Sequence, residues 1–231
     1  MCYPKAALRW EIASEASHDE AFSIQTSLAP LNLDYMNRGY FYANSENTGH
    51  PGSGPRAEPK LVVDEKPFPK GKLSVTVSQD NDLSFFNAAK GMWVGVGNTT
   101  RDTIFFNAQD SCLYMKMQAK DKDGEWRDIE YLPSSWCGNS YHVIMLPPDR
   151  YWSFVAPVYE GTFATTMRIA LTYIDPSEKA DPHSKLSSRL GYGGKRELIM
   201  FSGEFNGSVN PGQFWRRVEY SAAGIMDPYE E

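Results

Sequence analysis

Residues 112–131 read CLYMKMQAKDKDGEWRDIEY and carry the clearest structural signal in the chain. Apolar and polar side chains alternate along the first part of this stretch, and a period of two is typical of a β-strand with one buried face. The apolar face consists of Leu113, Met115, Met117 and Ala119. Asp123-Gly124 then supplies a turn that accepts positive φ, and EWRDIEY forms the return strand. The stretch predicts an antiparallel β-hairpin.

Strand patterns also occur on both sides of this hairpin. Residues 73–78 alternate as LSVTVS, and residues 167–173 place Met, Ile, Leu and Tyr at every second position. Residues 141–146, YHVIML, are apolar on both faces, which is typical of a central strand. We find no helical periodicity of consequence after residue 25. Many short strands separated by turns predict an all-β fold, an antiparallel sandwich or barrel.

A double proline marks a sharp corner between two of these strands. Pro147 and Pro148 fix φ and remove two backbone donors, so they end the strand before them. Tyr151 follows the corner, where its ring is expected to pack inward while its hydroxyl reaches a backbone group. Trp136 and Trp152 are interpreted as core or rim aromatics. The cluster of aromatics around the corner therefore indicates a structural bend rather than a site.

The segment from residue 93 to residue 174 resembles bacterial immunoglobulin-like or fibronectin-III-like domains of envelope proteins. It has a short strand ending at Asn98, an Asp-Gly hairpin followed by Trp126, the corner LPPDRYWSF and the late strand MRIALTY. Pro148-Asp149 stands where those families commonly carry Pro-Gly, and the disulfide-plus-tryptophan hallmark of antibody domains is missing. The resemblance implies an antiparallel immunoglobulin-like β-sandwich in the envelope or secreted pool of a bacterium. It implies no activity, because that fold hosts many functions.

The chain divides into an irregular N-terminal extension, residues 1–60, and a β-sandwich domain, residues 61–231. The end of the extension is rich in Gly, Pro, Ser and Asn, which is typical of an irregular connection. Its aromatic residues, Tyr35 and the YFY at residues 40–42, are too many for a disordered tail. We therefore expect the extension to pack on the core or on a partner.

Charge and composition exclude some partners. The formal net charge is −6 and the pI is about 5.3, without a clustered basic surface, which argues against nucleic acid as a partner. No apolar run approaches the roughly 18–20 residues of a membrane span. The first residues lack the pattern of a signal peptide.

Cys2 resembles the modified cysteine of a trimmed bacterial lipoprotein, and the alternative is an ordinary terminal residue. Lipidation at Cys2 is the only membrane attachment that we expect. It would place the protein in the bacterial cell envelope, in the periplasm or at the surface. The cytoplasm is the alternative location.

Two further cysteines and four histidines show no metal-binding spacing. Cys112 and Cys137 fall in neighbouring predicted strands, where they either pair or remain buried as small hydrophobes. His142 is interpreted as a hydrogen-bonded structural residue. We expect neither a metal nor a cofactor.

The sequence contains no recognisable catalytic constellation. There is no GxSxG, and no base can be named for Ser202, which lies close to Glu204. Asp128 and Glu130 are expected about 7 Å apart on one strand face, which would suit a glycosidase but is also how a solvated face looks. We interpret the pair as solvated and expect no catalytic residue, so the protein is not predicted to be an enzyme.

Two functions remain open. The first is a non-catalytic interaction protein of the cell envelope, possibly a lipid-anchored subunit of a larger assembly. It would bind a protein partner through residues 1–60 and the polar loop at 175–196. The second is a carbohydrate-binding module, because the flat apolar faces of exposed aromatic rings stack on sugar rings. The best candidates for such a platform are Trp10, Trp126 and Trp215.

Overall fold

A computed structural model describes residues 28–45, 56–63, 68–133, 135, 137, 140–177 and 196–215. Within these residues the regular structure is almost entirely β, and it includes no α-helix. The first strands are β1 (Asn37–Arg38), β2 (Lys60–Leu61), β3 (Leu73–Phe85), β4 (Ala89–Asn98), β5 (Ile104–Gln109), β6 (Cys112–Leu113) and β7 (Met115–Lys120). The later strands are β8 (Trp126–Asp128), β9 (Glu130–Tyr131), β10 (Tyr141–Leu146), β11 (Arg150–Pro157), β12 (Phe163–Ile174), β13 (Glu197–Phe201) and β14 (Phe205–Val209). A 3-10 turn, η2 (Pro211–Phe214), follows the last strand.

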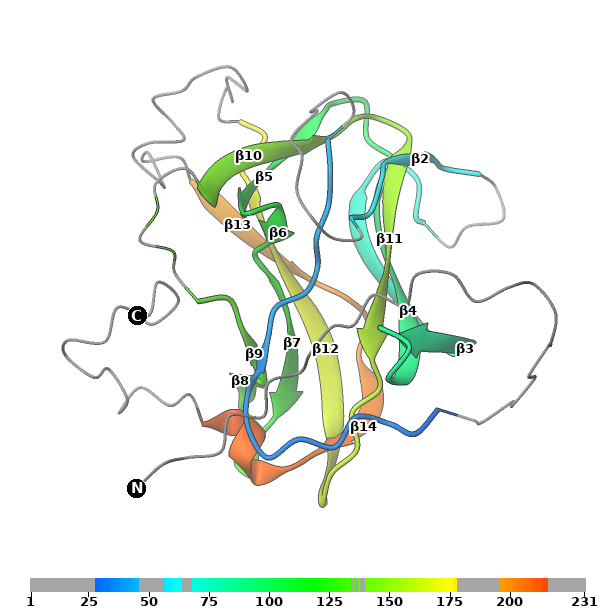
Figure 1. Ribbon diagram of the computed structural model, residues 1–231. Helices are drawn as coiled ribbons and strands as arrows, with labels where there is room; N and C mark the ends of the chain where they lie inside the picture. Colours follow the sequence, from blue (N-terminus) through cyan, green and yellow to red (C-terminus); the bar gives the residue numbers. More distant parts are fainter. Residues whose placement is uncertain are drawn as a thin grey trace, which may run out of the picture.

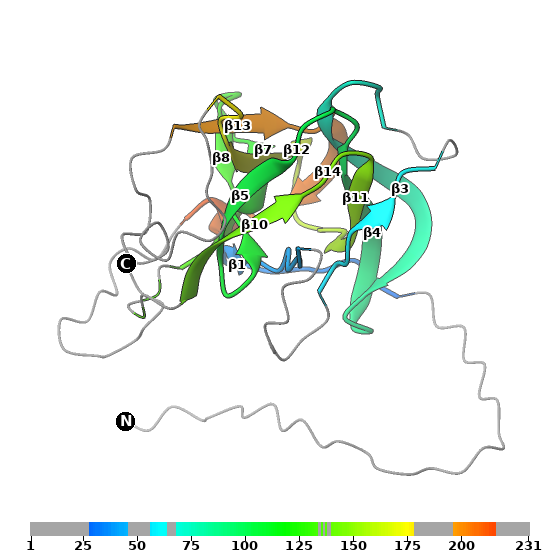
Figure 2. The same cartoon turned by 90° about the horizontal axis from the view of Figure 1, so that it is seen from above.

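The strands form mainly antiparallel sheets. One sheet has the order β2-β11-β4-β3, and a second has the order β13-β12-β7-β8 with β14 also paired to β12. A smaller sheet has the order β10-β5-β6, and β1 pairs with β9 in parallel. Figure 1 shows the sheet of β4 and β11 beside the sheet of β7 and β12, and Figure 2 shows the same separation from above.

A single hydrophobic core fills the space that these sheets enclose. Every sheet except the short β1–β9 pair contributes fully buried side chains that belong to one contact cluster. Examples are Met92, Val94 and Trp152 from the first sheet, Met117, Ile169 and Leu171 from the second, and Phe106 and Leu146 from the smaller sheet. The alternation predicted for residues 113–119 is confirmed, because each inward residue of that run is buried. In the run 167–173, Met167, Ile169 and Leu171 are buried as predicted, whereas Tyr173 is only half-buried.

The predicted turns are confirmed by the backbone. Gly124 has φ +81° in the β7–β8 hairpin. Asp149 has φ +52° and follows Pro148 at the corner between β10 and β11. Asp149 thus takes the left-handed conformation that glycine adopts most easily, which explains how Pro-Asp replaces Pro-Gly here.

Two expectations around this corner are wrong in detail. β10 is not central, because among the described residues it pairs only with β5, and Ser45 Oγ accepts a hydrogen bond from the Met145 N–H. Tyr151 is buried, but it packs on Phe68 with ring centroids 5.3 Å apart, outside the main core cluster. Its neighbour Trp152 takes the inward position and is fully buried. Alternation along β11 puts the two rings on opposite faces.

The described part of the N-terminal segment, residues 28–45, contributes to the same core. Phe41 and Ala43 are fully buried in the main cluster. The Phe41 carbonyl accepts a hydrogen bond from the Leu113 N–H, and the Ala43 N–H donates to the Ser111 carbonyl. This segment is therefore part of the fold's interior.

Asn210 connects the two ends of the described chain. Its side-chain amide donates to Asn32 Oδ1 over 2.7 Å and to the Leu33 carbonyl over 3.1 Å. Its Oδ1 accepts a hydrogen bond from the Thr162 N–H over 3.0 Å. Asn210 itself is buried, and its side chain satisfies its own polar atoms by joining two separate segments, residues 32–33 and Thr162.

Candidate ligand-binding cleft

A cleft of about 370 Å³ opens between the N-terminal segment, the β3–β4 turn and β11. Its volume falls in the usual range for small-molecule sites, roughly 300–1,000 Å³. The aromatic residues that line it are Tyr40, Tyr42, Phe85, Phe86 and Phe154. The polar residues that line it include Arg56, Ser84, Asn87 and Ser153. This combination of rings and a few polar groups is typical of a ligand-binding site.

The β3–β4 turn carries unusual backbone strain at the edge of this cleft. Phe86 and Asn87 have φ +48° and +55°, and the Ala88 N–H donates to the Phe85 carbonyl to close the turn. Asn tolerates this conformation, but a bulky Phe at positive φ costs energy on the order of 1 kcal/mol. The Phe86 side chain is 56% exposed, so burial does not offset the cost. An exposed bulky residue held at positive φ is typical of functional positions.

Edge-to-face contacts hold the aromatic wall in place. The rings of Phe85 and Phe86 are 4.5 Å apart with an interplanar angle of 72°, and those of Tyr40 and Phe85 are 4.9 Å apart at 75°. Such contacts add about 0.5–1.5 kcal/mol each beyond burial. The exposed ring of Phe86 is therefore fixed against a buried neighbour and needs little ordering when a ligand binds.

The polar groups at the cleft differ in how fully they are engaged. Ser153 Oγ accepts a hydrogen bond from Trp93 Nε1 over 2.9 Å, and Arg56 Nη1 donates to Asn44 Oδ1 over 3.4 Å. Asn87 Oδ1 accepts from Ser84 Oγ, but among the described residues no acceptor faces the Asn87 amide nitrogen. Asn87 and Arg56 therefore offer donors to a ligand in the cleft.

A buried carboxyl lies behind the cleft wall. Glu130 is fully buried, and its Oε1 accepts hydrogen bonds from the hydroxyls of Tyr40 and Tyr159, each over 2.7 Å. Its Oε2 accepts from the Met117 N–H over 2.8 Å. Burial raises the pKa of Glu130 to about 7, and these three hydrogen bonds partly oppose the shift. Burial of Tyr40, together with the neighbouring negative charge of Glu130, raises the pKa of Tyr40 well above its ordinary value.

The expected pairing of Asp128 and Glu130 on one solvated face is wrong. The strand is interrupted at Ile129, which is fully buried, and Glu130 then turns into the interior while Asp128 stays partly exposed. The two carboxyls therefore lie in different environments. This arrangement gives no support to a glycosidase pair.

A second cavity of about 460 Å³ lies between β4, β12 and β14. Met92, Met117 and Met167 contribute to its lining, and Tyr159 forms part of its wall. The cavity is mostly apolar, and Gln79, Asn206 and Ser208 are among the polar residues that line it. The two tyrosines that bind Glu130 thus stand at the edges of two different cavities.

Of the platform residues expected from sequence, Trp126 and Trp215 do not line either cavity. Trp126 lies on the outward face of β8, where the Arg168 guanidinium carbon stands 4.0 Å from the ring centroid and Lys120 Nζ stands 4.9 Å away. Trp215 is 75% exposed and directly follows η2. Trp10 and Cys2 fall outside the described residues, as does Trp136.

The cleft residues were missed because they are far apart in sequence. Tyr40 and Tyr42 come from a segment that looks irregular, whereas Phe85 ends β3 and Phe86 lies in the turn that follows. One local signal was present: FFN at residues 85–87 places two aromatics directly before a turn-forming Asn.

The closest approach to a catalytic arrangement in the described part of the chain is between Ser111 and His142. Ser111 Oγ lies 3.3 Å from His142 Nε2, and His142 Nδ1 lies 3.1 Å from the Ser140 carbonyl. A carbonyl only accepts, so Nδ1 carries the proton and Nε2 accepts from the serine. Ser111 is only 4% exposed, and neither cavity includes it or His142. The contact stabilises the β5–β6 turn, where Ser111 has φ +69°.

Other candidate groups have structural partners. Ser202 lies between β13 and β14, which pair with successive parts of β12. Its Oγ accepts a hydrogen bond from the Ile169 N–H and donates one to the Gly203 carbonyl. Cys112 and Cys137 are both free thiols, and burial raises the pKa of Cys112 to about 12. In the described ranges, no three metal-ligating side chains come together, and no helix has the length and apolarity to cross a bilayer.

No family model, curated protein or solved structure matches this chain. The candidate site therefore rests on its own geometry.

Proposed function

We propose that this chain is a non-catalytic carbohydrate-binding protein and that the aromatic cleft is its binding site. The observation that carries the proposal is Phe86, an exposed ring held at a strained turn and braced by Phe85 at the mouth of the cleft. An exposed, braced ring offers an apolar face on which the C–H groups of a sugar can stack.

The polar groups of the cleft fit the same ligand. A sugar ring presents hydroxyls around its edge, and these accept hydrogen bonds from donors such as the Asn87 amide and the Arg56 guanidinium. The cleft holds few ionisable groups, which suits a neutral or weakly acidic saccharide. Its volume of about 370 Å³ suits a short saccharide better than a long chain.

A glycan array followed by calorimetry tests the proposal. The wild-type protein is expected to bind a restricted set of saccharides, and Phe86→Ala and Asn87→Ala are each expected to weaken binding at least tenfold. Tyr35→Ala is the matched control, because Tyr35 is 56% exposed and does not line the cleft. A flat array response, or equal loss in the Tyr35 control, would remove the proposal.

A second candidate is the interaction protein of the cell envelope. It is favoured by the apolar side chains of Ile199 and Phe201, which are 61% and 45% exposed on β13. Large exposed apolar residues on a sheet are typical of protein contacts.

The proposal also includes a fold type, the immunoglobulin-like sandwich. It is supported by the antiparallel sheets around one core and by the Pro148-Asp149 corner.

The envelope location and the lipid at Cys2 belong to this second candidate. Intact-mass measurement on protein from native membranes tests them directly. Acyl chains on Cys2 are expected, and an unmodified cysteine in a soluble fraction would contradict the location.

A further inference from the structure

The outward face of the β13-β12-β7-β8 sheet carries an arginine held between aromatic rings. The guanidinium carbon of Arg168 stands 3.6 Å from the Phe201 ring centroid and 4.0 Å from that of Trp126. The rings come from β13 and β8, the strands on either side of the β12–β7 pair. Arg168 Nε donates to Gln118 Oε1 over 2.9 Å. These contacts fix the orientation of the guanidinium.

The terminal nitrogens of Arg168 have no acceptor within the described residues. The other cations on this face are already engaged, because Lys116 pairs with Asp128 and Lys120 pairs with Glu204. Burial lowers the pKa of Arg168, while Glu204 and Asp128 oppose the shift without a hydrogen bond to it. Arg168 is therefore the cation on this face that an incoming anion meets.

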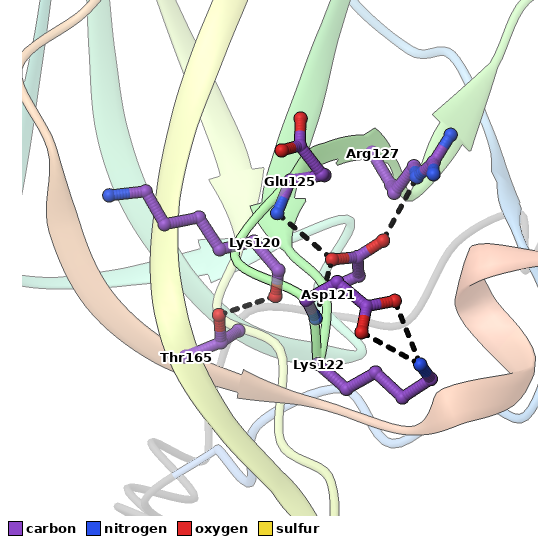
Figure 3. A network of polar contacts seen from close by, with 7 residues as sticks. Lys120, Asp121, Lys122, Glu125, Arg127 and Thr165 are labelled. Carbon is purple, nitrogen blue, oxygen red and sulfur yellow. Dashed lines mark hydrogen bonds and ion pairs between the residues drawn. The ribbon is translucent and has the colours of Figure 1, made fainter.

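Polar contacts around Asp121 order the hairpin that leads into Trp126, as Figure 3 shows. Asp121 Oδ1 accepts hydrogen bonds from the N–H groups of Asp123 and Glu125, and its Oδ2 accepts from Arg127 Nε. Glu125 and Arg127 are the two sequence neighbours of Trp126. The turn thus fixes one wall of the arginine site before any partner arrives.

The surroundings of Arg168 favour a protein over a small molecule. Neither cavity described above includes Arg168, Trp126 or Phe201, and β13 adds the exposed side chain of Ile199. Arginine, tryptophan and phenylalanine beside exposed aliphatic groups are the composition of protein-interface hot spots. A planar guanidinium binds a carboxylate through two parallel hydrogen bonds.

We propose that this face docks a protein partner through an extended acidic segment, with an aspartate or glutamate carboxylate bound to the terminal nitrogens of Arg168 and apolar neighbours packed on Phe201 and Ile199. Lys116 and Lys120 are neutralised by Asp128 and Glu204, and Glu197 adds a third carboxylate on the exposed face of β13, so Arg168 is the cation of this face that has no ion-pair partner within the described residues. This unpaired guanidinium favours an acidic partner. The docking face is separate from the saccharide cleft, so either proposal can fail alone.

A random-peptide display selection against the full chain tests the docking face. Enriched peptides are expected to share an acidic residue flanked by apolar ones. Their affinity should fall at least tenfold for Arg168→Ala. It should fall less for Arg168→Lys, because lysine keeps the charge but lacks the planar guanidinium that makes two parallel hydrogen bonds to a carboxylate. Arg101→Ala is the control, because Arg101 is exposed in the turn after β4. Matched circular dichroism and melting curves show that each variant is folded.

Three results would overturn the inference. The first is that no peptide is enriched, or that enriched peptides lack acidic residues or bind Arg168→Ala as well as wild type. The second is binding of polygalacturonate that depends on Arg168 without any peptide enrichment, which assigns the face to an acidic glycan. The third is a dimer in sedimentation that Arg168→Ala dissociates, which assigns the face to a second copy of the chain.

Discussion

The Tyr40 hydroxyl donates to Glu130 Oε1 over 2.7 Å, although 90 positions separate the two residues. Tyr40 also lines the aromatic cleft, so one side chain contacts both the candidate site and a buried carboxyl. The ionisation of Glu130 is therefore coupled to the stability of the fold and to the position of a cleft wall.

Stability is expected to fall between about pH 4.5 and pH 7 because of Glu130. The folded-state pKa is about 7 and the ordinary value is 4.5, so over this range the folded chain keeps a proton that the unfolded chain releases. The unfolded state then binds fewer protons, and the free energy of unfolding decreases as pH rises. The total change is roughly 3 kcal/mol, and it is complete above pH 7. Urea denaturation of wild type and Glu130→Gln across pH 4–8 measures it. Parallel curves for the two proteins would contradict the assignment.

Tyr40→Phe separates the hydrogen bond from the ring. The variant keeps the contact with Phe85 but removes a donor from a buried carboxyl, at a cost of about 1–3 kcal/mol. The loss should be larger at pH 8, where the carboxylate is charged, than at pH 5. Denaturation at both values tests this, and an equal loss would mean that the hydroxyl does not serve the charged form.

Phe86→Gly is expected to separate stability from binding. Glycine adopts φ near +48° without strain, but the variant also loses the ring contact with Phe85, so the free energy of unfolding should change by less than about 1 kcal/mol. Saccharide binding should fall at the same time, because the stacking ring is gone. Chemical denaturation and calorimetry on one preparation measure both effects. A variant that is less stable and binds normally would show that Phe86 has a structural role only.

Phe41→Ala tests whether the N-terminal segment belongs to the core. Phe41 is fully buried and its ring lies 5.5 Å from that of Phe154, so the variant should lose about 3–5 kcal/mol of stability. Deletion of residues 1–45 should prevent folding altogether. Tyr35→Ala again provides an exposed control. A stable, folded deletion product would show that the segment is dispensable.

Ser111 is expected not to react as a nucleophile, in keeping with the binding function proposed above. Incubation with a fluorophosphonate, followed by peptide mass spectrometry, should leave Ser111 unlabelled, because the side chain is nearly buried and serves the β5–β6 turn. Labelling at Ser111 that is lost in His142→Ala would identify a serine–histidine pair and replace the binding-only proposal with an enzyme.

Local patterns in the sequence predict the strands but not the site. Alternation identified Met115 and Met117 as inward residues, and Asp123-Gly124 predicted its turn, because both signals depend on neighbours in sequence. The burial of Glu130 depends on hydroxyls from Tyr40 and Tyr159, which sequence spacing does not reveal. The cleft was missed for the same reason, since its walls come from separated segments.

Asn32 and Asn210, joined by a side-chain hydrogen bond, are 178 residues apart. During synthesis the first of these segments leaves the ribosome long before its partner exists. The apolar core residues of the early segment stay exposed to solvent until the later strands are synthesised. Folding that depends on such late, non-local contacts is slow and prone to aggregation. Production of this protein should therefore depend on chaperones during translation more than its final stability suggests.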